Sequence, residues 1–244
     1  MPTSPWYQHS LDTVRELLCT CIGPKWGDAP EEKIREIRES RYTFGKRLCR
    51  KLDIQPTDTV LDFGSGCGFV SRAFCETARQ VHCADLNPEF LAFTRDELSM
   101  FDNTSFHHIS YASIQDLPDA SIDKAVSTAV FIHFLYYDIL FNLIELNRVL
   151  KPGAILYFDI LDADAIDLHN PAAIKYHIEI YKDSVRGDGF LLQPFSSTAL
   201  LKLAPQLGYE HIDTEHIGTG NSVAEITLRK VAQPDLPDWL AAKA

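Results

Sequence analysis

The chain has 244 residues, of which 45% are hydrophobic and 23% are charged, a composition typical of a soluble globular protein with a substantial core. The net charge of −11 repels phosphate groups, so we expect no nucleic acid partner. The sequence has no run of about 18 apolar residues, and its N-terminal residues do not resemble a signal peptide, so we expect no membrane span and a cytoplasmic location.

The six cysteines lie in the first third of the chain and form no Cys-x-x-Cys pair. No pair of histidines or cysteines at zinc-ligand spacing accompanies them, so the sequence predicts reduced thiols and no metal site. The cysteines stand at positions 19, 21, 49, 67, 75 and 83.

Two helices are predicted before the first strand. The apolar residues of 8–22 fall on one helical face, and a break rich in glycine and proline follows at 23–28. Asp28 is the expected N-cap of a second helix that runs to about Leu52. We assign residues 1–55 to an N-terminal helical cap, which can pack on the sheet, form a lid over a ligand, or do both.

From residue 58 strand-like and helix-like segments alternate, which predicts a mostly parallel sheet. Two further strand-like runs, 208–217 and 223–231, are joined by a short glycine-rich link and predict an antiparallel hairpin. We assign residues 56–231 to this α/β domain and 232–244 to a C-terminal tail. The expected parallel strands are 58–63, 80–85, 104–109, 122–129 and 154–160, and the expected helices lie near 68–78, 88–99, 136–150, 171–186 and 196–206.

A glycine-rich turn follows the first strand and has the pattern Asp-x-Gly-x-Gly-x-Gly, from Asp62 to Gly68. The Gly-x-Gly-x-x-Gly pattern of dinucleotide-binding enzymes would need a glycine at position 69, where Phe69 stands. A carboxylate at the end of the strand repels a pyrophosphate but attracts an ammonium group. The turn therefore indicates a nucleoside ligand that carries an amine.

This pattern resembles motif I of the class I (Rossmann-like) S-adenosylmethionine-dependent methyltransferases. The run from Glu145 to Leu156, which contains Arg-Val-Leu-Lys-Pro-Gly, resembles the family's lead-in to strand 5. The resemblance covers roughly residues 56–231. It implies an α/β fold with a doubly wound, mostly parallel seven-stranded sheet in the order 3-2-1-4-5-7-6, with the last strand antiparallel.

Asp85 ends the second strand, nineteen residues beyond Gly66, and its carboxylate can accept both ribose hydroxyls. The alternative is that Asp85 caps the helix that begins at Pro88. The resemblance implies S-adenosylmethionine as the cofactor, with the ammonium group held near Asp62 and the adenine near the loop after strand 3. The cofactor residues that it implies are Asp62, Gly64, Ser65, Gly66, Asp85, Leu86, Ser113, Ile114, Thr128 and Phe131.

The residues that face the methyl acceptor are expected after strand 4. His133 is the candidate general base there, because imidazole titrates near neutral pH. A packed structural role for His133 is the alternative. Tyr137 is a candidate for shaping the pocket, and Phe131 for lining the path of the methyl group. Four acidic residues between 159 and 167 either are solvated loop charges or recognise a cation.

We therefore expect an enzyme that transfers a methyl group from S-adenosylmethionine to a small molecule, at oxygen or nitrogen ahead of carbon. Two alternatives stay open: an NAD(P)-linked oxidoreductase, and a non-catalytic partner subunit that binds S-adenosylmethionine. The oligomeric state and the identity of the acceptor also stay open.

Overall fold

The computed structural model describes residues 7–110, 113–167, 169–186, 192–218 and 222–234. The chain divides into two compact units. The first unit comprises residues 1–108 and 187–190, and the second comprises residues 109–186 and 191–244. Each unit is described by itself. The proposed tail lies almost entirely outside the described residues.

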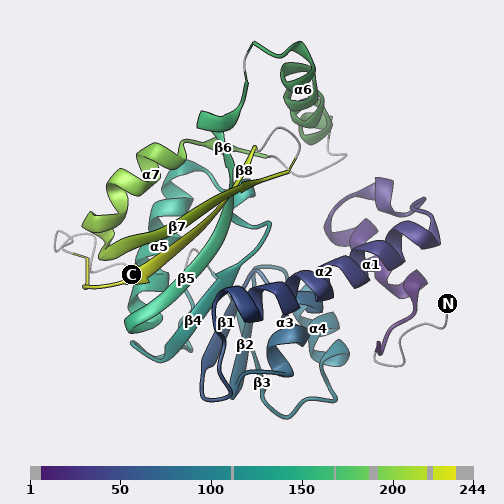
Figure 1. The fold of residues 1–244 in the computed structure, drawn as a ribbon. Helices are drawn as coiled ribbons and strands as arrows, with labels where there is room; N and C mark the ends of the chain where they lie inside the picture. Colours follow the sequence, from purple (N-terminus) through teal and green to yellow (C-terminus); the bar gives the residue numbers. More distant parts are fainter. Residues whose placement is uncertain (1–6, 111–112, 168, 187–191, 219–221, 235–244) are drawn as a thin grey trace. The chain divides into compact units, whose positions relative to one another are not determined.

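The first unit contains a three-stranded parallel sheet in the order β3-β2-β1 (Figure 1). Each strand begins within one residue of its expected position, because short apolar runs bounded by turns specify buried parallel strands well. The strands and their connecting helices are β1 (Thr59–Phe63), α3 (Phe69–Cys75), β2 (Gln80–Asp85), α4 (Pro88–Glu97) and β3 (Thr104–His108).

The N-terminal helices pack against α3 and α4 in this unit. They are α1 (Leu11–Cys21), the short 3-10 helix η1 (Pro24–Trp26) and α2 (Glu31–Lys51). Apolar side chains of α1 and α2 form one buried cluster with Phe69 of α3 and Phe93 of α4. Gly45 lets α2 approach α3 closely, because a Cβ at Gly45 would lie 2.8 Å from the Cβ of Ala73.

The predicted N-cap of α2 is wrong. Asp28 belongs to the turn after η1, in which the amide of Ala29 donates to the carbonyl of Trp26 at 3.1 Å. Pro30 is the N-cap instead, and no side chain caps this end. A proline at this position presets the backbone for the helix, so α2 begins without a capping carboxylate.

The second unit contains a sheet in the order β4-β5-β8-β7, and the two-residue β6 pairs with the end of β5. β8 runs antiparallel to both β5 and β7, which confirms the predicted hairpin and its antiparallel last strand. β6 was not predicted, because two residues carry no periodicity. The strands are β4 (Ile122–Ser127), β5 (Leu150–Asp162), β6 (Pro194–Phe195), β7 (Tyr209–Ile217) and β8 (Val223–Lys230).

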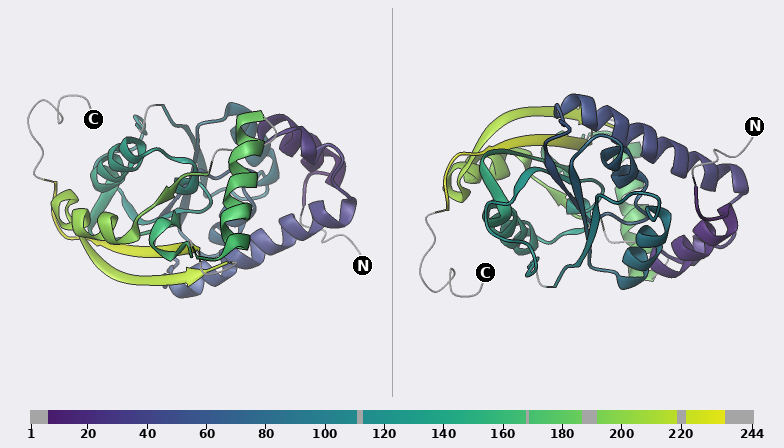
Figure 2. Two further views of the ribbon diagram at one scale, coloured as in Figure 1. Left: turned by 90° about the horizontal axis from the view of Figure 1, so that it is seen from above. Right: turned by 90° about the horizontal axis from the view of Figure 1, so that it is seen from below.

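The helices of this unit are α5 (Tyr136–Val149), α6 (Pro171–Arg186) and α7 (Ser197–Leu203), with the 3-10 helices η2 (Phe131–His133), η3 (Ala163–Ala165) and η4 (Ala204–Leu207). The bounds of α6 match the expected extra helix. Figures 1 and 2 show α6 beyond the C-terminal end of β5. In the described part of the chain, no helix is both long and apolar enough to cross a bilayer.

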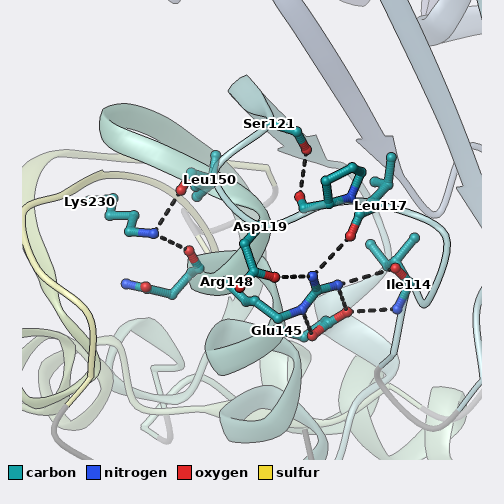
Figure 3. Close-up of polar contacts among 10 residues, drawn as sticks. Ile114, Leu117, Asp119, Ser121, Glu145, Arg148, Leu150 and Lys230 are labelled. Carbon is teal, nitrogen blue, oxygen red and sulfur yellow. Dashed lines mark hydrogen bonds and ion pairs between the residues drawn. The ribbon is translucent and has the colours of Figure 1, made fainter.

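An ion pair between the partly exposed Arg148 and the buried Glu145 carboxylate ties the loop before β4 to α5 (Figure 3). Arg148 donates to both carboxylate oxygens of Glu145 at 2.8 and 2.7 Å, and to the carbonyl of Leu117 at 2.9 Å. It also donates to the Asp119 carboxylate at 2.6 Å, while the amide of Ile114 donates to Glu145 at 2.7 Å. The pair therefore positions residues 114–119.

Replacing Arg148 with Met should lower the free energy of unfolding by about 2–4 kcal/mol, because the buried Glu145 carboxylate would lose its cation. Arg229→Met is the matched control. Its pair with Glu210 is exposed, with 3.3 Å between the charged atoms, so a loss below about 1 kcal/mol is expected. Urea unfolding of both variants measures the difference, and equal losses would contradict the assignment.

Two histidines contact each other between β2 and β3. The Nδ1 atom of His82 lies 2.8 Å from Nε2 of His107. Burial, together with the neighbouring His107 and Arg79, lowers the pKa of His82 from 6.5 to about 4. The folded protein therefore holds His82 neutral at pH values where the unfolded chain is protonated.

Because the folded-state pKa is depressed, stability should fall as the pH drops from about 6.5 to 4 and then level off. We expect His82 to account for about 2 kcal/mol of this loss. His82→Gln should flatten the pH dependence of urea unfolding over this range, whereas His169→Gln in an exposed loop should leave it unchanged. An unaltered slope in His82→Gln would show that other groups cause the loss.

Candidate functional site

The expected site residues fall into two sets. Asp62, Gly64, Ser65, Gly66, Asp85 and Leu86 belong to the first unit, at the C-terminal ends of β1 and β2. Ser113, Ile114, Thr128, Phe131, His133 and Tyr137 belong to the second unit, before β4 and after it.

Asp62 is a buried carboxylate with one unsatisfied oxygen. It lies in β1 and is 1% exposed. The Ser71 hydroxyl donates to its Oδ2 atom at 2.5 Å, while Oδ1 has no hydrogen-bond partner among the described residues. Burial raises the pKa of Asp62 to about 7, although the Ser71 hydrogen bond works in the opposite direction. Such an oxygen is suited to a buried cationic donor.

The glycine turn is held by its neighbours and leaves space at one position. Gly68 has φ +73°, and a Cβ there would lie 2.6 Å from Cγ2 of Thr94. The Thr94 hydroxyl donates to the carbonyl of Gly66 at 2.6 Å. Gly66 itself has φ +53°, with no atom within 4 Å of an added Cβ. The turn is therefore rigid, and a ligand can approach its backbone at Gly66.

Ser65 is buried in this turn, and its amide and that of Gly64 donate to the carbonyl of Ala84 at 3.0 and 2.7 Å. The turn is thereby anchored to β2. Sequence reasoning missed Thr94 and Ser71, which lie in helices at positions that carry no motif. Only their distance to the turn identifies them.

Asp85 links the end of β2 to the glycine turn. Its two carboxylate oxygens accept the amides of Gly66 and Asn87, each at 2.8 Å. The alternative that Asp85 caps α4 is wrong, because Asn87 is the N-cap and accepts the amide of Glu89 at 2.8 Å. Each oxygen of Asp85 keeps a lone pair for a further donor. Leu86 follows it and is 67% exposed.

The loop before β4 contains the two residues expected beside the adenine. Ile114 is fully buried, and its amide donates to Glu145. Its expected role beside the adenine stays a prediction. Ser113 is half-buried and forms a bridge with Ser110, whose carbonyl accepts the Ser113 amide at 2.9 Å.

The segment after β4 contains a strained residue. Ala129 has φ +57°, and its amide donates to Oδ1 of Asp159 at 2.8 Å. Positive φ at a non-glycine residue is uncommon and clusters at functional sites. Thr128 is buried immediately before it. The Phe131 ring is also buried, with its centroid 4.7 Å from that of the Phe158 ring, and its expected role beside the methyl path stays a prediction.

His133 is half-buried in η2, and Tyr137 is 70% exposed at the start of α5. The ring of Tyr136 contacts Tyr137 on one side and Phe195 of β6 on the other, with centroid separations of 5.4 and 5.3 Å. An aromatic surface therefore adjoins His133. Within the described ranges, no group of three or more His, Cys, Asp or Glu residues is placed to hold a metal ion.

Residues 61–158 match a family model described as a methyltransferase domain. A solved SAM-dependent methyltransferase from Methanosarcina mazei superposes with a TM-score of 0.62 at 19% identity, over 76% of this chain and 98% of that one. The chain therefore contains a segment that matches a methyltransferase domain and has the fold of solved SAM-dependent methyltransferases. Both findings agree with the class I resemblance seen in the sequence, and the shared α/β fold agrees with the sheet order found in each unit.

Two curated relatives give further similarity to this methyltransferase. Malonyl-[acyl-carrier protein] O-methyltransferase of Serratia marcescens is 32% identical over 124 residues, 50% of this chain and 46% of that protein. Ribosomal RNA small subunit methyltransferase A of Thermotoga petrophila is 20% identical over 98 residues, 40% of this chain and 38% of that protein. The part of this chain that matches thus spans less than half the length of each of these relatives.

The residues of the first unit fit the family's cofactor, S-adenosylmethionine. Its methionine ammonium matches the unsatisfied oxygen of buried Asp62, and its ribose diol matches the remaining lone pairs of Asp85. The open space at Gly66 leaves the backbone of the turn accessible. The chemistry of the donors and acceptors therefore agrees with the cofactor.

Gly66→Ala should weaken S-adenosylmethionine binding by about tenfold or more, because a methyl group would occupy the open approach to the turn. Gly153→Ala is a matched control, since Gly153 also has positive φ and no atom within 4 Å of an added Cβ. Both variants should lose about 1 kcal/mol of stability from backbone strain. Calorimetric titration and urea unfolding separate the effects, and equal cofactor affinity in the two variants would contradict the prediction.

Proposed function

We propose that this methyltransferase transfers a methyl group from S-adenosylmethionine to an oxygen or nitrogen atom of a small molecule. The observation that carries the proposal is the buried, half-satisfied Asp62 carboxylate beside the open glycine turn. When bound, the cofactor supplies a methyl group already activated by a positive sulfur. The protein contributes positioning and, for a hydroxyl or amine acceptor, removal of a proton.

Each unit has its own part in this proposal. Asp62 and the backbone of Gly64, Ser65 and Gly66 hold the methionine portion, Asp85 holds the ribose, and Leu86 covers the adenine. In the second unit Ser113 and Thr128 are cofactor contacts, Tyr137 shapes the acceptor pocket, and His133 is the candidate base. Ile114 and Phe131, whose side chains are buried, stay predicted cofactor contacts.

The proposed class of methyl acceptor rests on the net charge of the chain and on the aromatic side chains around Tyr137. The two relatives are named for acceptors as different as ribosomal RNA and malonyl-[acyl-carrier protein]. The similarity to a methyltransferase domain therefore does not identify the acceptor of this protein. The net charge of −11 disfavours RNA. The exposed aromatic side chains around Tyr137 favour a small organic acceptor. The expected cytoplasmic location belongs to the same proposal.

Calorimetric titration with S-adenosylmethionine and with NADH tests the cofactor. S-adenosylmethionine should bind, and its affinity should rise between pH 6 and 8 as Asp62, whose pKa is about 7, becomes ionised. Asp62→Asn should weaken binding about 10–100-fold and remove this pH dependence, because a charged hydrogen bond is lost. The exposed Asp102→Asn variant is the control.

Binding of NADH without S-adenosylmethionine would overturn the proposal in favour of an oxidoreductase. Binding of S-adenosylmethionine with no methylated product from a panel of hydroxyl, carboxylate and amine compounds would favour the non-catalytic partner subunit. Mass spectrometry of the panel detects the addition of one methyl group.

A further inference from the structure

A buried carboxylate, a serine and a histidine meet where β5 and β7 end. Asp162, the last residue of β5, is 1% exposed. Its carboxylate accepts the Ser197 hydroxyl at 2.7 Å, the Ser197 amide at 3.0 Å and the Asp164 amide at 3.0 Å. His216 of β7 completes the set, with Nε2 2.8 Å from Oδ2 of Asp162. A loop aspartate expected to be solvated is therefore a buried acceptor.

The sheet register brings His216 to Asp162 across an intervening strand. His216 pairs with Ala224 of β8, and Ala224 pairs with Ile160 of β5. The side chains of Ile160 and Asp162 share one face because they are two residues apart. Ala224 is fully buried and small, so the imidazole can pass over β8 to the carboxylate. A larger residue at 224 would block this path.

The hydrogen bonds determine which imidazole nitrogen carries a proton. Burial alone would raise the pKa of Asp162, but the hydrogen bonds from Ser197, His216 and the Asp164 amide lower it below its ordinary value. An ionised carboxylate only accepts, so Nε2 of His216 must donate to it. The neutral imidazole then has its lone pair on Nδ1. The side chain of His216 is 38% exposed, which leaves part of the imidazole accessible to a ligand.

This pair lies at the ligand-binding edge of the sheet. β4, β5 and β7 are parallel, so their C-terminal ends lie on one edge, where doubly wound sheets bind ligands. The segment before α7 connects Asp162 and His216 to η2 and the start of α5, where the acceptor is expected. The Gln193 amide donates to the Ile132 carbonyl in η2 at 2.8 Å, Phe195 contacts Tyr136, and Phe195 pairs with Asp162.

We propose that His216, in place of His133, is the proton acceptor of the methyl transfer and that Asp162 is a positioning residue that holds its tautomer. This inference rests on the proposed function. The bond between the methyl carbon and sulfur breaks with its electron pair on sulfur, and the acceptor oxygen or nitrogen bonds to the methyl carbon. The acceptor's proton moves to Nδ1 of His216 and then to solvent, so atoms and charge balance.

The tautomer is tested without any acceptor. Long-range ¹H–¹⁵N correlation spectra of the full chain, assigned by comparison with His216→Gln, should show neutral His216 protonated at Nε2 above pH 8. Asp162→Asn should shift the population toward the other tautomer. A neutral His216 protonated at Nδ1 in the unmodified protein would overturn the inference.

The chemical role is tested on an acceptor that turns over in the compound panel. His216→Gln keeps an amide donor for Asp162 but cannot take up a proton, so kcat should fall about 100-fold or more. The affinity for S-adenosylmethionine, the KM for the acceptor and the melting temperature should stay nearly unchanged. His211→Gln on the same strand is the control.

The outcomes separate this inference from the proposed function. Turnover that survives in His216→Gln but is lost in His133→Gln would overturn the inference and leave methyl transfer in place. A lowered melting temperature with unchanged kcat would show that the pair is only a structural link between β5 and β7. Cofactor binding with no product from any acceptor would overturn both proposals.

Discussion

The burial of the Asp62 carboxylate is the constraint on which the first unit depends. An ionised carboxylate in a nearly water-free position is unfavourable unless donors surround it, and one hydroxyl from Ser71 meets only part of that need. The raised pKa of Asp62 expresses this cost. A ligand with an ammonium group would supply the missing donor and would lower the free energy of the buried Asp62 carboxylate. Cofactor binding therefore also stabilises the strand end on which the glycine turn is built.

The sequence predicted the fold closely because its strands and helices are specified locally. β2 and α6 have the bounds that their apolar runs and flanking residues indicate, and the hairpin of β7 and β8 follows from a short link between two strand-like runs. The errors have a different origin. Asp28 and Asp85 are both plausible caps by residue type, but each is two positions before the residue whose backbone geometry starts the helix. Residue type alone does not distinguish neighbouring candidates at a helix end.

The positions of site residues could be predicted where one motif contains them, and less well where distant segments meet. The placement of Asp62, Gly66 and Asp85 at the ends of β1 and β2 follows from spacing, because a strand, a turn and a helix determine it locally. The burial of Ile114 and Phe131 could not be predicted, because it depends on partners about thirty residues away, Glu145 and Phe158. The contact between Asp162 and His216 joins positions 54 residues apart. This contact also requires the small Ala224 on a third strand, so no local sequence pattern predicts it.

The glycine turn and the edge formed by β5, β6 and β7 differ in how well they tolerate substitutions. The glycine turn is confined by Thr94 and by the carbonyl of Ala84, so most substitutions there disturb β1, β2 and α4 together. The edge formed by β5, β6 and β7 is assembled from side chains on separate strands, and several of them are partly exposed. A substitution at Tyr137 or His216 alters the chemistry of this edge while the sheet ladder beneath it stays intact. Under the proposed function, this arrangement lets one cofactor-binding framework be combined with different acceptor chemistries, and the proposed determinants of the acceptor belong to the second unit.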